Sequence, residues 1–133
     1  MRLLLDTNVF LEVILEQKQD RTARELFSKT EQHEFFISDY SLHSIGLLLF
    51  RRKQHHVFKQ FLADMITNAG VKLIALMSED VEKVVDVAQK YNLDFDDAYQ
   101  YALAEQFGLT IVSFDSDFDR TEKGRKSPAE IKA

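Results

Sequence analysis

Short apolar runs alternate with stretches of helical hydrophobic spacing along the chain. The first run, at residues 3–5, is three leucines between polar residues, a pattern typical of a strand buried on both faces. Similar runs at residues 35–38, 71–76 and 110–114 predict three more strands. Because the strands alternate with helices, the pattern predicts an α/β sandwich around a parallel central sheet with right-handed crossovers.

The predicted helices lie between these strands, and several begin at residues that favour helix N-caps. They cover residues 9–14, the segment from Asp20 through Phe27, residues 42–50, residues 57–66, a segment opened by Ser78, and the segment from Asp94 to near Gly108. The helix opened by Ser78 is expected to bury one apolar face, formed by Val81, Val84, Val85 and Ala88. The tail from Thr121 is expected to be irregular or to form a short edge strand near Ile131.

Residues 42–50 make a helix that is apolar on more than one side. A helix with so little polar surface either lies in the centre of the core or is covered by another chain. The second alternative predicts self-association or a groove that holds a partner peptide.

The composition limits the classes of protein and site that remain. A chain of 133 residues is the size of one domain, and we treat residues 1–133 as one unit. The chain has no cysteine, which excludes zinc–thiolate sites and cysteine nucleophiles and fits a cytoplasmic protein. No apolar run approaches the length of a membrane span, so no membrane partner is expected. A net charge of -5 argues against a protein that holds nucleic acid by bulk charge alone.

Acidic residues stand after two predicted strands and at the start of a late helix. Asp6 follows the first strand, Asp115 and Asp117 follow the fourth, and residues 94–97 open the helix. If the first and fourth strands are neighbours, these carboxylates meet at one edge of the sheet. A group of this kind raises its members' pKa values or recruits a cation, and its all-oxygen ligands suit Mg²⁺ or Mn²⁺. Each acid taken alone is also explained as a helix cap.

Three motifs, taken in order, resemble the acidic motifs of PIN-domain nucleases. They are Leu3-Leu4-Leu5-Asp6-Thr7-Asn8-Val9-Phe10, then Leu93-Asp94-Phe95-Asp96-Asp97-Ala98, then Ile111-Val112-Ser113-Phe114-Asp115-Ser116-Asp117-Phe118. The resemblance implies a PIN-like three-layer α/β/α sandwich with a central parallel sheet of four to five strands. It also implies an Mg²⁺- or Mn²⁺-dependent ribonuclease of the VapC toxin type, with RNA as substrate and a cognate antitoxin as a partner. The homodimer is expected instead from the apolar helix at residues 42–50.

The resemblance further implies roles for individual residues. The catalytic, metal-holding acids would be Asp6, Asp97 and Asp115, supported by Asn8, Ser113, Asp94 and Asp117. Independently of the resemblance, the positive charge of Arg51, Arg52 and Lys53 predicts contacts with RNA phosphates, although such a run is also typical of a helix C-terminus.

At Ser44 the sequence departs from the family, which usually has a glutamate there. The departure favours an alternative function, a PIN-like binding module with weak or no turnover that acts through RNA or protein contacts. Asp39 lies five residues earlier and therefore not on the same helix face, so it is expected to replace the missing acid poorly. A phosphoacceptor receiver domain is a more distant alternative, because it would need an acid pair where Asp6 stands beside Thr7.

Overall fold

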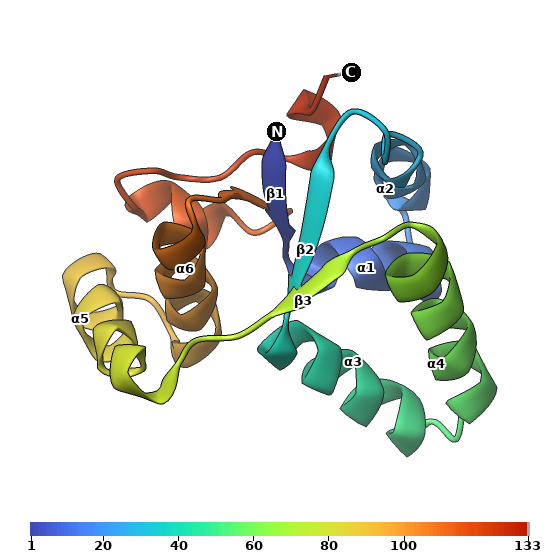
Figure 1. Ribbon diagram of the computed structural model, residues 1–133, viewed down its shortest axis with the longest axis horizontal. Coiled ribbons are helices and arrows are strands. Elements are labelled where there is room, and N and C mark those ends of the chain that lie inside the picture. The colour runs from blue at the N-terminus through green and yellow to red at the C-terminus, as the bar shows by residue number, and fades with distance from the viewer. Residues whose placement is uncertain (133) are drawn as a thin grey trace.

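The computed structural model describes residues 1–132 and is organised around one parallel sheet (Figure 1). Its strands are β1 (Arg2–Leu5), β2 (Glu34–Ser38), β3 (Lys72–Ile74) and β4 (Thr110–Val112), in the order β3-β2-β1-β4. All three pairings are parallel, and β1 lies between β2 and β4. The first and fourth strands are therefore neighbours, as the acidic motifs require.

Six α-helices flank the sheet. They are α1 (Thr7–Ile14), α2 (Asp20–Phe27), α3 (Asp39–Arg51), α4 (His55–Phe61), α5 (Glu82–Tyr91) and α6 (Phe95–Phe107). A π-helical segment, η1 (Leu62–Asn68), extends α4, and three short 3₁₀ turns complete the elements: η2 (Ser78–Asp80), η3 (Ser116–Arg120) and η4 (Pro128–Glu130). None of the helices within residues 1–132 has both the length and the apolar character that crossing a bilayer requires.

The leucine run of β1 explains why the molecule has three layers. Leu3 and Leu5 face one core cluster, which also holds buried residues of α1 to α4, and Leu4 faces the second cluster, built largely from α5 and α6. Successive side chains of a strand point to opposite faces, so a strand covered on both sides needs apolar residues throughout. Figure 1 shows α1 to α4 on one side of the sheet and α5 and α6 on the other. The predicted α/β/α sandwich is confirmed, with four strands.

Helices α1 and α3 start where a strand ends, and α6 starts at a cap of the same kind. Asp6 caps α1 by accepting from Thr7 N at 2.9 Å, and Ser38 caps α3 by accepting from Ser41 N at 3.0 Å. Asp94 caps α6 and accepts from Asp97 N at 3.2 Å. Each cap satisfies a backbone N–H that has no partner within its own helix.

The predicted apolar face of α5 was partly wrong. Val84 is buried and Ala88 is partly buried against the second core, as predicted, whereas Val81 and Val85 are 41% and 54% exposed; Val87, which was not predicted, is buried. Val81 precedes α5, which begins only at Glu82, and Val85 lies about 100° around the helix from Val84, away from the face that Val84, Val87 and Ala88 present to the second core.

Two other elements differ from the prediction in extent. Strands β3 and β4 are shorter than expected; β4 ends at Val112, and the next residue donates from Ser113 N to Lys126 O of the tail at 3.0 Å. Of the two alternatives for the tail, the irregular one is confirmed: within the described residues the tail forms no strand near Ile131 and makes a single parallel bridge to β4, between Lys126 and Val112. Ile131 instead follows a 3₁₀ turn and is buried in the first core.

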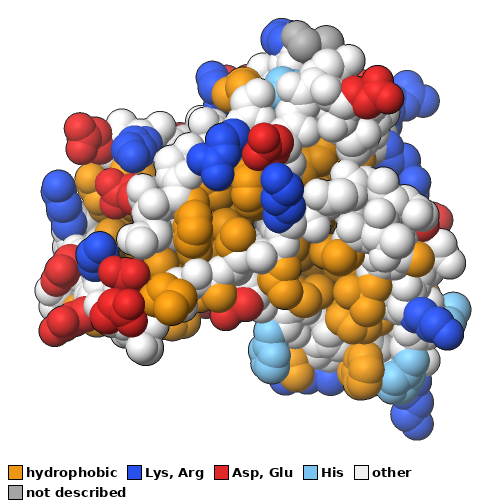
Figure 2. Space-filling view, viewed as in Figure 1, with side chains coloured by type: hydrophobic (Ala, Val, Ile, Leu, Met, Phe, Trp, Pro, Cys, Tyr) orange, Lys and Arg blue, Asp and Glu red, His pale blue; other side chains and the backbone are white. Residues whose placement is uncertain are grey.

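Helix α3 buries one side and exposes another. Ile45 and Leu49 are fully buried, while Leu47 and Phe50 are 43% and 52% exposed. Leu47, Phe50 and Phe58 of α4 line a mainly apolar groove between the two helices. Figure 2 shows hydrophobic side chains gathered on this face of the molecule. Helix α3 is therefore not central in the core, and part of its apolar surface stays open in this chain.

Candidate metal centre

Three carboxylates lie close together at the carboxyl end of the sheet. Oxygens of Asp97, Asp115 and Asp117 all lie within 4.8 Å of one another. Asp97 is buried in the first turn of α6, whereas Asp115 and Asp117 are partly exposed around the start of η3. The structure thus brings together two of the acids predicted to hold the metal and the acid predicted to assist them.

Asp6 lies beside this group and is held by three donors. Its Oδ1 accepts from Thr7 N at 2.9 Å and from Gln100 Nε2 at 3.2 Å, and its Oδ2 accepts from Ser113 Oγ at 2.7 Å. Burial raises the pKa of Asp6, the hydrogen bonds from Ser113, Gln100 and Thr7 lower it, and the charge of Asp115 raises it further. Asp6 is not a member of the group within 4.8 Å.

Asn8 and Ser113 connect Asp6 to the end of β4. Asn8 Nδ2 donates to Ser113 Oγ at 3.2 Å, and Asn8 Oδ1 accepts from Phe114 N at 3.3 Å. Ser113 Oγ also accepts from Asp115 N at 2.9 Å. These bonds fix the chain segment that carries Asp115 against the segment that carries Asp6.

The charges of the centre oppose one another in the absence of a cation. Burial raises the pKa of Asp97 to about 8, together with the charges of Asp115, Asp94, Asp6 and Asp117, in that order. Ionising all of these carboxyl groups at this separation costs free energy because their charges repel one another, and a divalent cation offsets that repulsion. Since every ligand atom in the cluster is a carboxylate oxygen, the residues present fit Mg²⁺ or Mn²⁺.

Two polar residues of α3 lie near this edge, the uncharged Ser44 and the acid Asp39. Ser44 is half-buried, and its hydroxyl lowers the pKa of the Tyr40 phenol, which burial and the nearby carboxylates of Asp96 and Asp6 raise. Asp39, the acid of this helix, instead accepts from Tyr99 Oη at 2.7 Å and from Tyr40 N at 2.9 Å. Its carboxylate is therefore engaged away from the cluster.

The predicted RNA-contacting residues are not next to the acids. Arg51, Arg52 and Lys53 are exposed at the far end of α3, and 13 helical residues span about 20 Å. Closer basic residues come from η3 and the tail. Arg120 at the end of η3 donates from Nη2 to Asp117 Oδ1 at 2.7 Å, and Arg125 of the tail donates from Nη1 to Ser113 O at 3.0 Å.

Gln100 is a site residue that the sequence analysis did not identify. It is 1% exposed on α6, and its Nε2 donates to Asp6 Oδ1 and to Ser41 Oγ, the latter at 2.9 Å. The available signal is its position three residues after Asp97, which places both side chains on one helix face.

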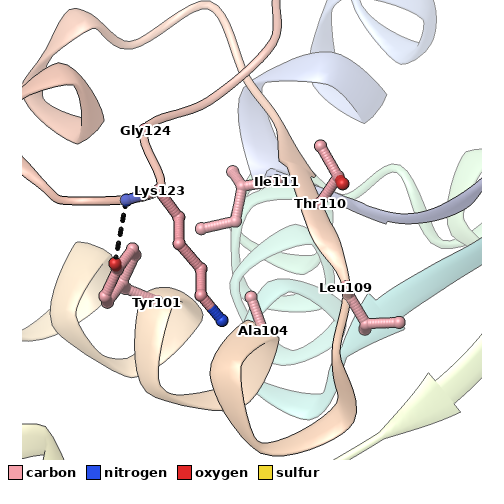
Figure 3. A pocket seen from close by; sticks show the side chains of 7 residues that line it. All are labelled: Tyr101, Ala104, Leu109, Thr110, Ile111, Lys123 and Gly124. Carbon is pink, nitrogen blue, oxygen red and sulfur yellow. Dashed lines mark hydrogen bonds between the residues drawn. The ribbon is translucent and has the colours of Figure 1, made fainter.

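A separate pocket lies near the amino end of β4. It is lined by Tyr101, Ala104, Leu109, Thr110, Ile111, Lys123 and Gly124 (Figure 3). Tyr101 Oη accepts from Lys123 N at 3.2 Å, the bond drawn in Figure 3. Because the acids follow the carboxyl end of the strand, this pocket belongs to the opposite end of β4.

Comparison with known proteins identifies the class of fold. Residues 3–124 match the family model of the PIN domain, and the chain therefore belongs to the PIN-domain family. No curated protein matches the chain.

The similar solved structures include VapC-type toxins. One is VapC20 of Mycobacterium tuberculosis, a sarcin–ricin-loop-cleaving toxin, with 20% identity, a TM-score of 0.71 and coverage of 88% of this chain and 92% of that chain. VapBC2 of Rickettsia felis, bound to a DNA fragment from its promoter, has 14% identity, a TM-score of 0.74 and coverage of 96% and 98%. A toxin–antitoxin complex from Klebsiella pneumoniae has 24% identity, a TM-score of 0.69 and coverage of 96% and 98%. At these identities the likeness shows the fold alone, and this chain shares that fold with the three structures.

Proposed function

We propose that this protein is an Mg²⁺- or Mn²⁺-dependent endoribonuclease that acts in the cytoplasm as the toxin of a toxin–antitoxin pair. The observation that carries the proposal is the set of carboxylates of Asp97, Asp115 and Asp117 beside Asp6, at the carboxyl edge of a PIN-domain sheet. Similarity of fold to a toxin that cleaves the sarcin–ricin loop supports RNA as the substrate class.

The cation would be held by Asp6, Asp97 and Asp115, with Asp117 at the exposed side. A divalent ion in such a site lowers the pKa of a bound water and offsets charge on the leaving oxygen of a phosphodiester. The protein supplies orientation: Ser113 donates to Asp6, and Asn8 donates to Ser113, so the carboxylates keep fixed positions. Fixed carboxylates need not reorganise when charge develops in the transition state.

A cleavage assay with metal tests the proposal. Purified protein with Mn²⁺ should cut a mixture of structured and single-stranded RNA, and EDTA should stop the reaction. Asp97→Asn should abolish cleavage, whereas Asp86→Asn, the same change at an exposed position of α5, should leave it intact. Cleavage that persists in EDTA and in Asp97→Asn would refute the proposal.

Ser44 is the observation that favours the second candidate, a binding module without turnover. A hydroxyl at this position provides no charge and a weaker oxygen ligand than a carboxylate, so the centre has fewer strong ligands. The binding module predicts that Mn²⁺ does not raise thermal stability and that no RNA is cut. The nuclease predicts that Mn²⁺ raises the thermal stability and that RNA is cut.

The apolar groove on α3 and α4 is the surface that we assign to protein partners. Leu47 and Phe50 are large, exposed and adjacent on α3, and a second copy or an antitoxin segment would cover them. The Rickettsia felis and Klebsiella pneumoniae structures are of toxins with their antitoxins, which supports an antitoxin as one partner. Arg51, Arg52 and Lys53 follow the groove at the end of α3 and would contact RNA phosphates beyond the cleavage site.

A further inference from the structure

We propose that Gln100 is a positioning residue of the metal centre, which holds the Asp6 carboxylate in place for the cation. This inference rests on the proposed function, because it concerns the same site. It assigns to α6 a second task besides carrying Asp97.

Both amide hydrogens of Gln100 are used. Nε2 donates to Asp6 Oδ1 at 3.2 Å and to Ser41 Oγ at 2.9 Å. The opposite orientation of the amide would place its oxygen against a carboxylate that only accepts hydrogen bonds when ionised. The charge of Asp6 therefore fixes the orientation of the Gln100 side chain, and Gln100 in turn fixes the position of Oδ1.

The contacts of Gln100 close a ring of hydrogen bonds. Ser41 Oγ also accepts from Thr7 Oγ1 at 2.7 Å, and Thr7 N donates to Asp6 Oδ1. The ring runs through Asp6, Gln100, Ser41 and Thr7, and it joins the N-terminal parts of α1, α3 and α6. Since Ser113 holds Oδ2 from the other side, the Asp6 carboxylate is held at both oxygens.

The acceptor of Gln100 indicates that folding stability alone does not explain the residue. Its Oε1 is buried and has no hydrogen-bond partner among residues 1–132. A buried acceptor without a partner costs folding free energy, and a methionine would fill the same space without that cost. The two hydrogen bonds that Gln100 donates to Asp6 and Ser41 explain why a glutamine stands here although its buried Oε1 lowers folding stability.

Metal affinity is the measurement that tests this role. Groups that orient a metal ligand typically change affinity by 10- to 100-fold when removed. Gln100→Met keeps the side-chain volume and removes both donors, so we expect Mn²⁺ to bind about 10-fold more weakly, measured by electron paramagnetic resonance of free Mn²⁺. The matched control is Gln106→Met, the same change at an exposed position of α6, which should bind Mn²⁺ like the wild-type chain.

A double-mutant cycle separates positioning from a general effect on structure. If Gln100 acts through Asp6, Gln100→Met should cause little further loss of Mn²⁺ affinity in an Asp6→Asn background. An equal loss in both backgrounds would overturn the proposal. Circular dichroism shows whether Gln100→Met folds. If it does not, Ser41→Ala is the second variant, because it opens the same ring of hydrogen bonds and should weaken Mn²⁺ binding a few-fold. Unchanged Mn²⁺ affinity of Ser41→Ala would overturn the proposal.

The result also distinguishes this inference from the function on which it rests. A wild-type chain that binds no Mn²⁺ refutes the metal-dependent nuclease and, with it, the role of Gln100. A wild-type chain that binds Mn²⁺ and a folded Gln100→Met chain that binds it equally well refute only the role of Gln100.

Discussion

Replacing Asp97 by asparagine should stabilise the metal-free protein. The carboxyl of Asp97 has a pKa of about 8 in the folded chain, against an ordinary value of 3.8. The folded state therefore holds the proton more tightly than the unfolded state, and the free energy of unfolding falls as pH rises from about 4 to about 8. Asparagine carries no charge at any pH, so the variant does not lose this part of its free energy of unfolding as pH rises.

The size of the effect follows from the same two pKa values. Between the ordinary pKa of 3.8 and pH 7, the free energy of unfolding would fall by about 4 kcal/mol, at about 1.4 kcal/mol per pH unit. Asp115 and Asp117 are partly exposed, and water screens their charges, so we expect roughly 1–2 kcal/mol. For a chain of this length the gain in melting temperature is about 3 to 8 °C.

Thermal melts in EDTA measure this gain. The difference between Asp97→Asn and the wild-type chain should be larger at about pH 7.5 than at about pH 5, because the penalty grows with pH between the two pKa values. Mn²⁺ should raise the melting temperature of the wild-type chain and leave that of the variant unchanged. A variant that melts below the wild-type chain in EDTA at neutral pH would show that Asp97 is ionised and stabilising, and the electrostatic reasoning would fail.

Three further substitutions test separate parts of the structure. Ser44→Glu should lower the melting temperature in EDTA and tighten Mn²⁺ binding, since it adds a carboxylate near the acids; unchanged Mn²⁺ affinity in a calorimetric titration would show that position 44 does not face the centre. Asp39→Asn should keep the Mn²⁺ affinity within about twofold of the wild-type value, because Asp39 accepts from Tyr99 and the amide oxygen of the asparagine can accept the same hydrogen bond. Loss of Mn²⁺ binding in the same titration would contradict the geometry. Phe50→Glu should convert a wild-type dimer to a monomer in sedimentation velocity, whereas a wild-type chain that is already monomeric at high concentration would remove the homodimer.

The sequence was informative where a feature depends on neighbouring residues. The leucine run of β1 and the caps Asp6, Ser38 and Asp94 are local signals, because burial on both faces and unpaired helix N–H groups make the same demands in any fold. The placement of acids after strands then required only parallel pairing of β1 with β4, which the structure has.

Features that depend on distant residues were not predictable. The partners of Gln100 are Asp6 and Ser41, 94 and 59 residues away, so the sequence places Gln100 on the same face of α6 as Asp97 but does not show which side chains it contacts. The exposed side of α5 was also missed, because valines at positions 81, 84 and 85 do not show which side of the helix packs against α6; that depends on the placement of α6.

The adjacency of β1 and β4 also sets the order in which the centre forms. Asp6 and Ser113 are 107 residues apart in the chain, so the bond between them closes a very long loop. Pairing across such separations is slow, because the loop entropy is lost before the contacts form. A partly folded chain without β4 lacks Asp115 and Asp117 at the sheet edge and cannot bind a cation there. Mn²⁺ should therefore slow unfolding of the finished protein and leave its refolding rate almost unchanged, since interactions absent from the transition state act on the unfolding step.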